Sequence, residues 1–255
     1  MILTIDIGNS NIMLGGFVND ELTFVSRLST DSLRTEDEYA IQILAALTLY
    51  KVDKSEINGA IVSSVVPPLN TVMKGAVKII LGKEPMFVGP GIKSGIGIQC
   101  DIPSSVGADL IAASVGAHYI YGSPALIVDM DTATKITLVN GKGAFVGTSI
   151  LPGVLMGLDA LSEGTAQLPK ISLEAPSSVI GRNTVDCMRS GAIYGNASMI
   201  DGMIDRINEE YGDELKVYAT GSMAAYVIPY CKHSIKTDDY LVLKGLNILY
   251  KRNNH

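Results

Sequence analysis

Cysteine is scarce in this sequence and follows no recognisable spacing. The three cysteines, Cys100, Cys187 and Cys231, are odd in number and match no metal-binding or disulfide motif. The three histidines do not cluster either, so a zinc site is not expected. This usage favours reduced thiols in a cytoplasmic protein over a disulfide-linked secreted one.

Positive charge and long apolar runs are scarce as well. The sequence has 20 Lys and Arg against 26 Asp and Glu, and it contains no long basic run. Because nucleic acids are held by phosphate-neutralising Lys and Arg, we expect no nucleic-acid partner. No apolar stretch approaches the roughly 18 residues of a membrane span, and residues 1–5 lack the charged region of an export signal. The 47% of hydrophobic residues nevertheless suffices for a globular core.

Two common nucleotide-binding motifs are absent, and a different pattern occurs twice. There is no Gly-x-x-x-x-Gly-Lys-Ser/Thr and no Gly-x-Gly-x-x-Gly after a strand-like run, so neither a Walker-type site nor a dinucleotide site is supported. Instead, one apolar run ends in Asp6 before a polar turn at 8–11, and another ends in Asp129 before a turn at 131–134. Because the aspartates lie about half a chain length apart, the repetition predicts a duplicated domain.

The predicted elements follow the same order in each half. Three strand-like segments come first, and helices alternating with strands follow them. The first helix, 36–50, begins with a capping-box signature in which Thr35 precedes Glu38 by three residues. This order predicts an α/β protein whose sheets begin antiparallel and continue parallel. We expect one lobe over 1–120 and a second over 121–255, with the two Asp-containing turns lining a cleft between them.

The two turns carry groups that suit the phosphates of a nucleotide. Asp6 could hold Mg²⁺ beside the phosphates, Gly8 allows close approach of the backbone, and residues 9–11 offer side-chain and amide donors. Asp129 is a second candidate cation ligand, and the threonines of 132–134 are candidate donors. The alternative, that each segment is only a hairpin turn, is disfavoured by the pairing of the two patterns.

Two further segments are candidates on weaker patterns. Thr220-Gly221-Ser222 joins a predicted strand to a helix whose N-terminus could bind anions or approach adenosine, although an ordinary turn would look the same. Asp109 lies in the first turn of the predicted helix 106–121, where a carboxylate could accept the proton of a hydroxyl during phosphoryl transfer. Asp109 could equally be a charge that stabilises the N-terminus of its helix.

A longer set of motifs runs in order through nearly the whole chain and resembles the type III pantothenate kinase family. The motifs are Asp6-Ile7-Gly8-Asn9-Ser10, Arg27 with Thr30, Asp37-Glu38-Tyr39-Ala40, Ser64-Val65-Val66-Pro67-Pro68, Gly107-Ala108-Asp109, Asp129-x-x-Thr132-Ala133, Leu151-Pro152-Gly153, Thr165-Ala166-Gln167-Leu168-Pro169, Gly181-Arg182-Asn183-Thr184, Thr220-Gly221 and Gly245-Leu246.

The resemblance implies a fold, an activity and an assembly. The fold is a duplicated ribonuclease-H-like fold of the actin-like ATPases, with a mixed five-stranded sheet in each lobe. The activity is ATP-dependent phosphorylation of pantothenate to 4'-phosphopantothenate, the first step of coenzyme A biosynthesis, with Mg²⁺ and a monovalent cation such as K⁺ or NH₄⁺. The assembly is a homodimer in which Thr184 reaches the substrate of the other subunit.

The resemblance also assigns roles to individual residues. Asp109 becomes the proton acceptor, Asp129 the ligand of the monovalent cation, and Asp6 the group that holds Mg²⁺ through the phosphates. The ATP-binding residues would be Asp6, Ile7, Gly8, Asn9, Ser10, Asn11, Ile12, Met13, Thr132, Thr220 and Gly221. The pantothenate-binding residues would be Cys100, Gly107, Ala108, Asp109, Leu110 and Thr184.

The sequence departs from the family pattern at a few positions. Asp131 stands where the second phosphate turn of the family has glycine. If the turn needs positive φ, aspartate adopts it at a higher energy than glycine. Asp131 would also bring a carboxylate towards the phosphates. Leu110 stands where the family has an arginine, and leucine cannot hold the carboxylate of pantothenate. Cys100 and Ile102 replace a tyrosine and an asparagine, and Ser222 replaces a second glycine.

Two functional hypotheses are compatible with these departures. In the first, the chain is a working pantothenate kinase in which Asp131 shares an extra cation with Asp129 and another residue holds the substrate's carboxylate. In the second, the chain has lost, weakened or redirected its activity, and acts as a ligand-binding or regulatory protein or as a kinase for another hydroxy acid.

Overall fold

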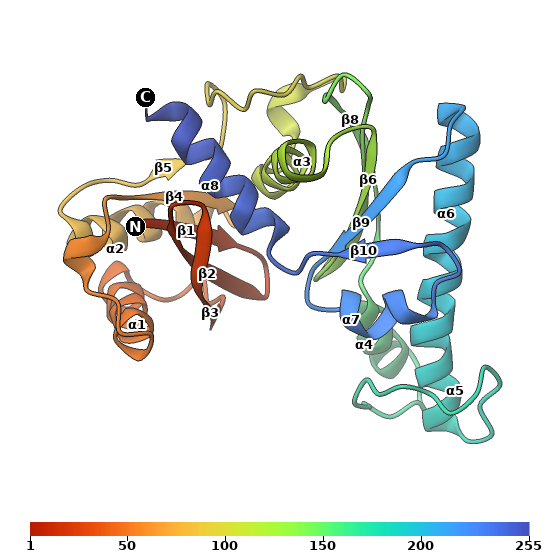
Figure 1. Cartoon of the computed structure of the whole chain (residues 1–255). Coiled ribbons are helices and arrows are strands. Elements are labelled where there is room, and N and C mark those ends of the chain that lie inside the picture. The colour runs from red at the N-terminus through yellow and green to blue at the C-terminus, as the bar shows by residue number, and fades with distance from the viewer. Residues whose placement is uncertain (255) are drawn as a thin grey trace. The chain divides into compact units, whose positions relative to one another are not determined.

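The computed structural model describes residues 1–254, which form two compact units. Of the described residues, the first unit comprises Met1–Tyr121 together with 241–254, and the second comprises Gly122–Tyr240. Each unit is built on one five-stranded sheet flanked by helices (Figure 1).

The sheet of the first unit has the strand order β3-β2-β1-β4-β5. The antiparallel strands β1, β2 and β3 pair in chain order, and β4 and β5 extend the sheet in parallel beside β1. The bounds are β1 Ile2–Ile7, β2 Asn11–Val18, β3 Glu21–Ser29, β4 Gly59–Ser64 and β5 Met86–Phe87; the helices are α1 Glu36–Leu49, α2 Pro68–Leu81, α3 Ala108–Tyr121 and α8 Leu241–Asn253, with short 3-10 turns η1 Lys54–Glu56 and η2 Pro103–Ser105.

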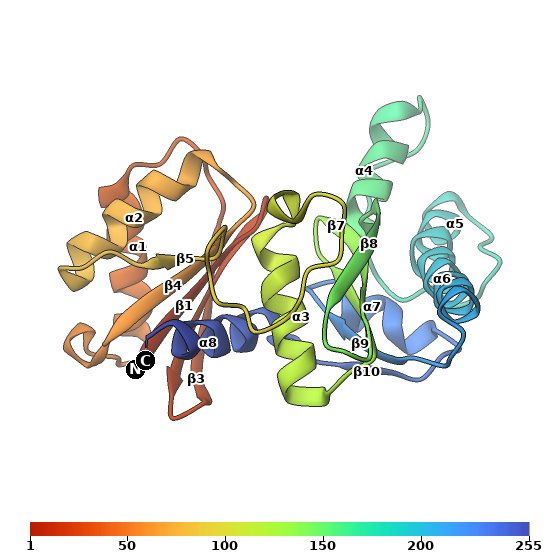
Figure 2. The same cartoon turned by 90° about the horizontal axis from the view of Figure 1, so that it is seen from above.

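Alternation along β1 separates the two faces of this sheet. Leu3, Ile5 and Ile7 are fully buried in the cluster that also contains the apolar residues of α1 and α2. The other face is covered by α8 (Figure 2). Leu243 of α8 packs on Gly15, and Tyr250 of α8 packs on Gly59. The face of β1 that α8 covers carries Ile2, Thr4 and Asp6, of which Thr4 is fully buried.

The C-terminal helix α8 packs directly on α3 through two glycines. A Cβ atom at Gly245 would lie 1.8 Å from the carbonyl oxygen of Ala112, and one at Gly116 would lie 2.7 Å from that of Leu241. Only glycine lets the two backbones approach this closely. The prediction that all of 121–255 belongs to the second lobe is therefore wrong for the residues of α8, which return to the first unit; His255 lies outside the described residues.

The second unit repeats the topology of the first. Its sheet has the order β10-β9-β6-β7-β8, in which β6, β7 and β8 are antiparallel and β9 and β10 continue in parallel. The bounds are β6 Ala125–Met130, β7 Ala133–Val139, β8 Phe145–Pro152, β9 Lys216–Thr220 and β10 Ile235–Thr237; the helices are α4 Val154–Gly164, α5 Thr184–Ser190, the π-helix η3 Gly191–Gly195, α6 Asn196–Tyr211, α7 Ala224–Val227 and the 3-10 turn η4 Ile228–Tyr230.

The helices of the second unit bury one face of its sheet. Leu126, Val128 and Met130 of β6 belong to a cluster with the apolar residues of α4, α6 and α7. The helix predicted over 184–211 is continuous but contains the one-turn π-helix between α5 and α6. The equivalent strand order in both units confirms the predicted duplication and the mixed five-stranded sheets. Among the described helices, none combines the length and the apolar character that a membrane crossing requires.

Candidate active site

The turn between β1 and β2 is held in shape by the segment that follows β3. The Gly8 amide donates to the Asn11 carbonyl at 3.0 Å, and a Cβ atom at Gly8 would lie 3.1 Å from that oxygen. The hydroxyl of Thr30 donates to the Gly8 carbonyl at 2.7 Å, and its amide donates to the Ser10 carbonyl at 3.1 Å. Thr30 therefore fixes both ends of this turn, a role that its place in the sequence motif did not reveal.

The predicted ATP-binding residues of this turn divide into two groups. Ile7 and Ile12 are fully buried in the core, so only their backbones could face a ligand. Asn9, Ser10 and Asn11 are exposed. Turns that present several polar side chains and amides are typical phosphate-binding segments.

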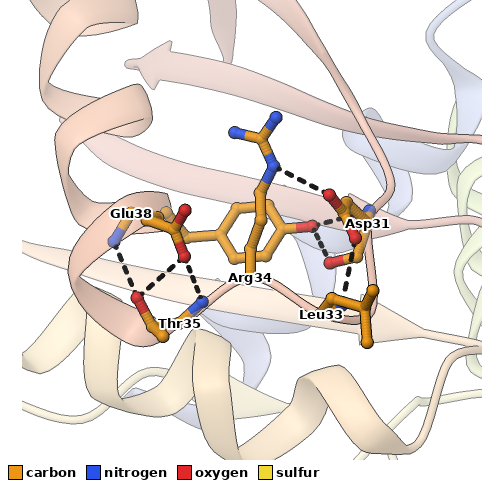
Figure 3. A network of polar contacts seen from close by, with 6 residues as sticks. Asp31, Leu33, Arg34, Thr35 and Glu38 are labelled. Atoms are coloured by element: carbon orange, nitrogen blue, oxygen red, sulfur yellow. Dashed lines mark hydrogen bonds and ion pairs between the residues drawn. The ribbon is translucent and has the colours of Figure 1, made fainter.

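Polar contacts connect Asp31, the residue after Thr30, to the start of α1. Tyr39, which is fully buried, uses its hydroxyl to accept from the Asp31 amide and to donate to the Asp31 carbonyl, both at 2.9 Å (Figure 3). Arg34 pairs with the Asp31 carboxylate at 3.3 Å. Thr35 and Glu38 form the predicted capping box, and the hydrogen bond from the Thr35 backbone is the main cause that lowers the pKa of Glu38. Thr30 directly precedes Asp31, so it links the turn between β1 and β2 to the anchored start of α1.

Three segments of the second unit meet at the turn between β6 and β7. A Cβ atom at Gly153 would lie 2.2 Å from the Thr132 carbonyl, so the glycine of the Leu-Pro-Gly motif is needed to fit against the turn. Gly221 has φ +94°, and a Cβ atom there would lie 2.6 Å from the backbone of Met130. Gly221 is therefore required both by its conformation and by its contact with the end of β6.

The two departures Asp131 and Ser222 are partners. Asp131 Oδ1 accepts from the Ser222 amide at 2.9 Å and from the Ser222 hydroxyl at 2.7 Å. The parallel register explains the pairing, since Asp129 lies opposite Thr220 and the two residues follow at the same distance on each strand. The expected cost of positive φ does not arise, because the non-glycine residues with positive φ among 1–254 do not include Asp131. The structure also shows this carboxylate bonded to Ser222.

The threonines near the second turn differ in accessibility. Thr132 is half-buried in the turn itself. Thr134 is fully buried, and it lies on the same face of β7 as Ile136, a member of the helix-covered core. The expectation that Thr134 donates to phosphates is therefore wrong, because strand alternation points it into the core. Thr220 is buried at the end of β9.

The aspartates Asp6 and Asp129 occupy equivalent positions, one residue before the end of β1 and β6. Each has an antiparallel neighbour, which is Met13 for Asp6 and Lys135 for Asp129. The Lys135 Nζ atom lies 2.7 Å from Asp129 Oδ2, and the side chains are only 17% and 6% exposed. Sequence reasoning missed Lys135, although the hairpin register that follows from the turn would have placed it beside Asp129.

The candidate proton acceptor lies at the N-terminus of α3. Asp109 is 8% exposed, and a Cβ atom at residue 107 would lie 2.5 Å from Asp109 Oδ1. Gly107 thus makes room for the carboxylate to turn back over the start of the helix. Leu110 is 7% exposed, so the residue that replaces the family's arginine is an apolar, mostly buried side chain.

The loop before α3 encloses a cavity of about 330 Å³. The loop is tied down by α3 and α8: Tyr119 donates to the Gly95 carbonyl at 3.1 Å, and Asn253 bonds to both the amide and the carbonyl of Lys93. The cavity wall includes Ala108, one of the predicted substrate residues, and its other lining residues within the described chain are uncharged: Val88, Gly89, Pro90, Gly91, Ile92, Ser94, Ile98, Pro103, Ser104, Val106 and Ile111.

The other five predicted substrate residues do not line that cavity: Cys100, Gly107, Asp109, Leu110 and Thr184. Cys100 is half-buried in the same loop. Thr184 is exposed at the first position of α5, directly after the N-cap Asn183, which accepts from the Asp186 amide. A Cβ atom at Gly181 would lie 2.3 Å from the Cys187 amide, so this glycine brings the preceding loop close to α5.

The equivalent sheets of the two units define the class of fold, a duplicated ribonuclease-H-like fold. A solved structure of this fold, a Sinorhizobium meliloti protein to which 2-dehydro-3-deoxygalactonokinase activity is ascribed, aligns with a TM-score of 0.62 at 12% identity, covering 98% of this chain and 96% of that chain. At this identity the likeness shows the fold alone.

Sequence comparison then gives the family. The family model described as type III pantothenate kinase matches residues 2–206. A type III pantothenate kinase of Moorella thermoacetica is 40% identical, over 99% of this chain and 100% of the relative, and one of Geobacter sulfurreducens is 41% identical, over 99% of each. The chain belongs to the type III pantothenate kinase family.

Proposed function

We propose that this chain transfers the γ-phosphoryl group of ATP to the hydroxyl of pantothenate, forming 4'-phosphopantothenate for coenzyme A biosynthesis in the cytoplasm. One observation carries the proposal. The chain matches its pantothenate kinase relatives from end to end, and the ends of β1 and β6 both present an aspartate followed by a polar turn. Phosphoryl transfer depends mainly on such positioning of phosphates and cations.

The residues take the following roles in this proposal. Asn9, Ser10 and Asn11 bind phosphate oxygens from the first turn, and Thr132 binds them from the second. Asp6 holds Mg²⁺ through the phosphates, as expected of a hard cation that keeps several waters. Asp109 accepts the proton of the pantothenate hydroxyl.

A second candidate function is favoured by Leu110. Pantothenate carries a carboxylate, yet Leu110 is apolar and buried, and the described wall of the neighbouring cavity has no cation. A chain that binds ligands without turnover, or one that phosphorylates a different hydroxy acid, would fit this feature. The two candidate functions differ in the product formed.

The deciding experiment is a mass-spectrometric assay for 4'-phosphopantothenate with purified protein, Mg²⁺-ATP and pantothenate. The Asp109→Asn variant should lose about two to four orders of magnitude in kcat if Asp109 is a general base. Asp37→Asn is the matched control, because it removes an exposed carboxylate from the first turn of α1. Equal activity of the two variants would show that Asp109 serves only its helix, and no product from the unmodified chain would reject the kinase proposal.

We also propose a homodimer in which Thr184 serves the substrate of the other subunit. Mixing Asp109→Asn protein with Thr184→Ala protein tests this, because a mixed dimer then contains one site with both residues intact. If each variant alone is inactive, random exchange should restore about a quarter of the activity of the unmodified protein, as a two-fold symmetric dimer requires. No restoration after proven subunit exchange would place both residues of one site on the same chain.

A further inference from the structure

The ion pair between Lys135 and Asp129 bears on the monovalent cation that the family resemblance places at Asp129. Asp129 and Lys135 lie directly opposite each other in the β6–β7 hairpin, so their side chains emerge on the same face of the sheet. The Nζ atom lies 2.7 Å from Asp129 Oδ2. The carboxylate that would hold the cation is therefore in contact with an ammonium group of this chain.

The burial of the pair shows that this contact is part of the folded sheet. The side chain of Lys135 is 17% exposed and that of Asp129 is 6% exposed. A surface ion pair exchanges readily with water and contributes little. A pair with this little exposure is costly to break, because each charge would remain buried without its counter-charge.

The donor set does not fit a separate monovalent cation. Potassium, ammonium and the lysine ammonium carry the same charge, and the lysine ammonium is itself a tethered alkyl ammonium ion. A second cation at Asp129 would have to lie beside Lys135, where like charges repel each other. The charge of Asp131 lies on the neighbouring turn and is bonded to Ser222 instead.

We propose that the ammonium of Lys135 takes the place of the monovalent cation at Asp129, so that ATP binding by this chain requires neither K⁺ nor NH₄⁺. The inference rests on the proposed ATP-dependent function. In this assignment Lys135 is a positioning residue: it neutralises Asp129 at the end of β6, next to the turn that contains Thr132. Tethering removes the need to capture an ion from solution, because the linked group acts at a high effective concentration.

The test measures ATP binding by calorimetry in choline, potassium and ammonium chloride at equal ionic strength, with Mg²⁺ present. For the unmodified chain, the Kd for ATP should agree within about twofold in the three salts. The Lys135→Met variant keeps the unbranched stem but loses the charge. It should bind ATP about tenfold more weakly in choline and recover at least in part in potassium. Lys135→Arg should remain independent of the salt.

A matched control and a second readout separate this role from a structural one. Lys142→Met removes an exposed lysine from the β7–β8 turn and should change nothing. In the ATP-free protein, potassium should raise the Tm of Lys135→Met and leave that of the unmodified chain unchanged, because only a protein that binds the ion is stabilised by it. If Lys135→Met does not fold, the salt series of the unmodified chain decides.

Several results would overturn the inference. Tighter ATP binding by the unmodified chain in potassium than in choline, by about tenfold, would show that it needs the free ion. Normal ATP binding by the Lys135→Met variant in choline would also reject the inference. So would weak binding by this variant that potassium does not restore. ATP binding without formation of 4'-phosphopantothenate would reject only the proposed reaction, and absence of ATP binding in every salt would reject both.

Discussion

Replacing Gly245 with alanine should force α3 and α8 apart and destabilise the first unit by about 3 kcal/mol. The added Cβ atom would lie 1.8 Å from the carbonyl oxygen of Ala112, and an ordinary contact needs at least 3.4 Å. The obstacle is a backbone atom of a helix, so it cannot move aside as a side chain would. The cost should therefore reach the upper end of the range for overpacked cores, which is about 1–3 kcal/mol.

The matched control is Gly157→Ala in α4, where a Cβ atom would meet nothing within 4 Å. Because alanine has the higher helix propensity, this variant should be more stable by about 0.5–1 kcal/mol. Thermal unfolding followed by circular dichroism measures both changes. Gly245→Ala should lower the Tm of its unit by roughly 6–12 °C, at 2–4 °C per kcal/mol. A Tm equal to that of the unmodified protein would refute the close crossing of the two helices.

Three other substitutions or treatments give sharp expectations. Asp131→Asn keeps an acceptor for Ser222 but removes an exposed charge. It should tighten ATP binding about fivefold, equivalent to roughly 1 kcal/mol at the water-like dielectric of an exposed group. Unchanged affinity in calorimetry would show that the carboxylate does not face the phosphates. Leu110→Arg should lower the KM for pantothenate and Leu110→Met should not; a folded Leu110→Arg protein with an unchanged KM would rule out this position as the carboxylate contact. Burial, with a smaller effect from Asp201, raises the pKa of Cys231 to about 12. Iodoacetamide at pH 8 should therefore modify the exposed Cys187 and spare Cys231 in the native protein. Comparable labelling of the two cysteines in peptide mass maps would contradict the burial of Cys231.

Much of the first unit's local structure was predictable because it depends on neighbours in sequence. The capping box of Thr35 and Glu38 starts α1 where the pattern placed it. The apolar run that ends in Asp6 likewise forms β1 where the pattern placed a strand. Both signals act over a few residues, through hydrogen bonds to the nearest backbone and through the two-residue period of a strand.

The candidate site was predictable only in part. The sequence identified Asp131 and Ser222 as separate departures, but 91 positions separate them, and their hydrogen bonds depend on β6 and β9 being parallel neighbours in one register. The sequence also placed Thr134 among the phosphate donors, whereas Thr134 lies on the core-facing side of β7 and is fully buried. Sequence spacing cannot decide such pairings, because many registers are compatible with the same apolar pattern.

The sequence alone established the duplication, the two aspartates at equivalent strand ends and the resemblance to a kinase family, because each of these is written in short, ordered motifs. The tertiary structure decided three other features. In the structure, α8 packs in the first unit, where Gly116 and Gly245 allow the backbones of α3 and α8 to come into contact. Asp131 accepts a hydrogen bond from Ser222, and the ammonium of Lys135 forms an ion pair with Asp129. Each depends on which backbones lie side by side, and that is settled by packing of the whole unit.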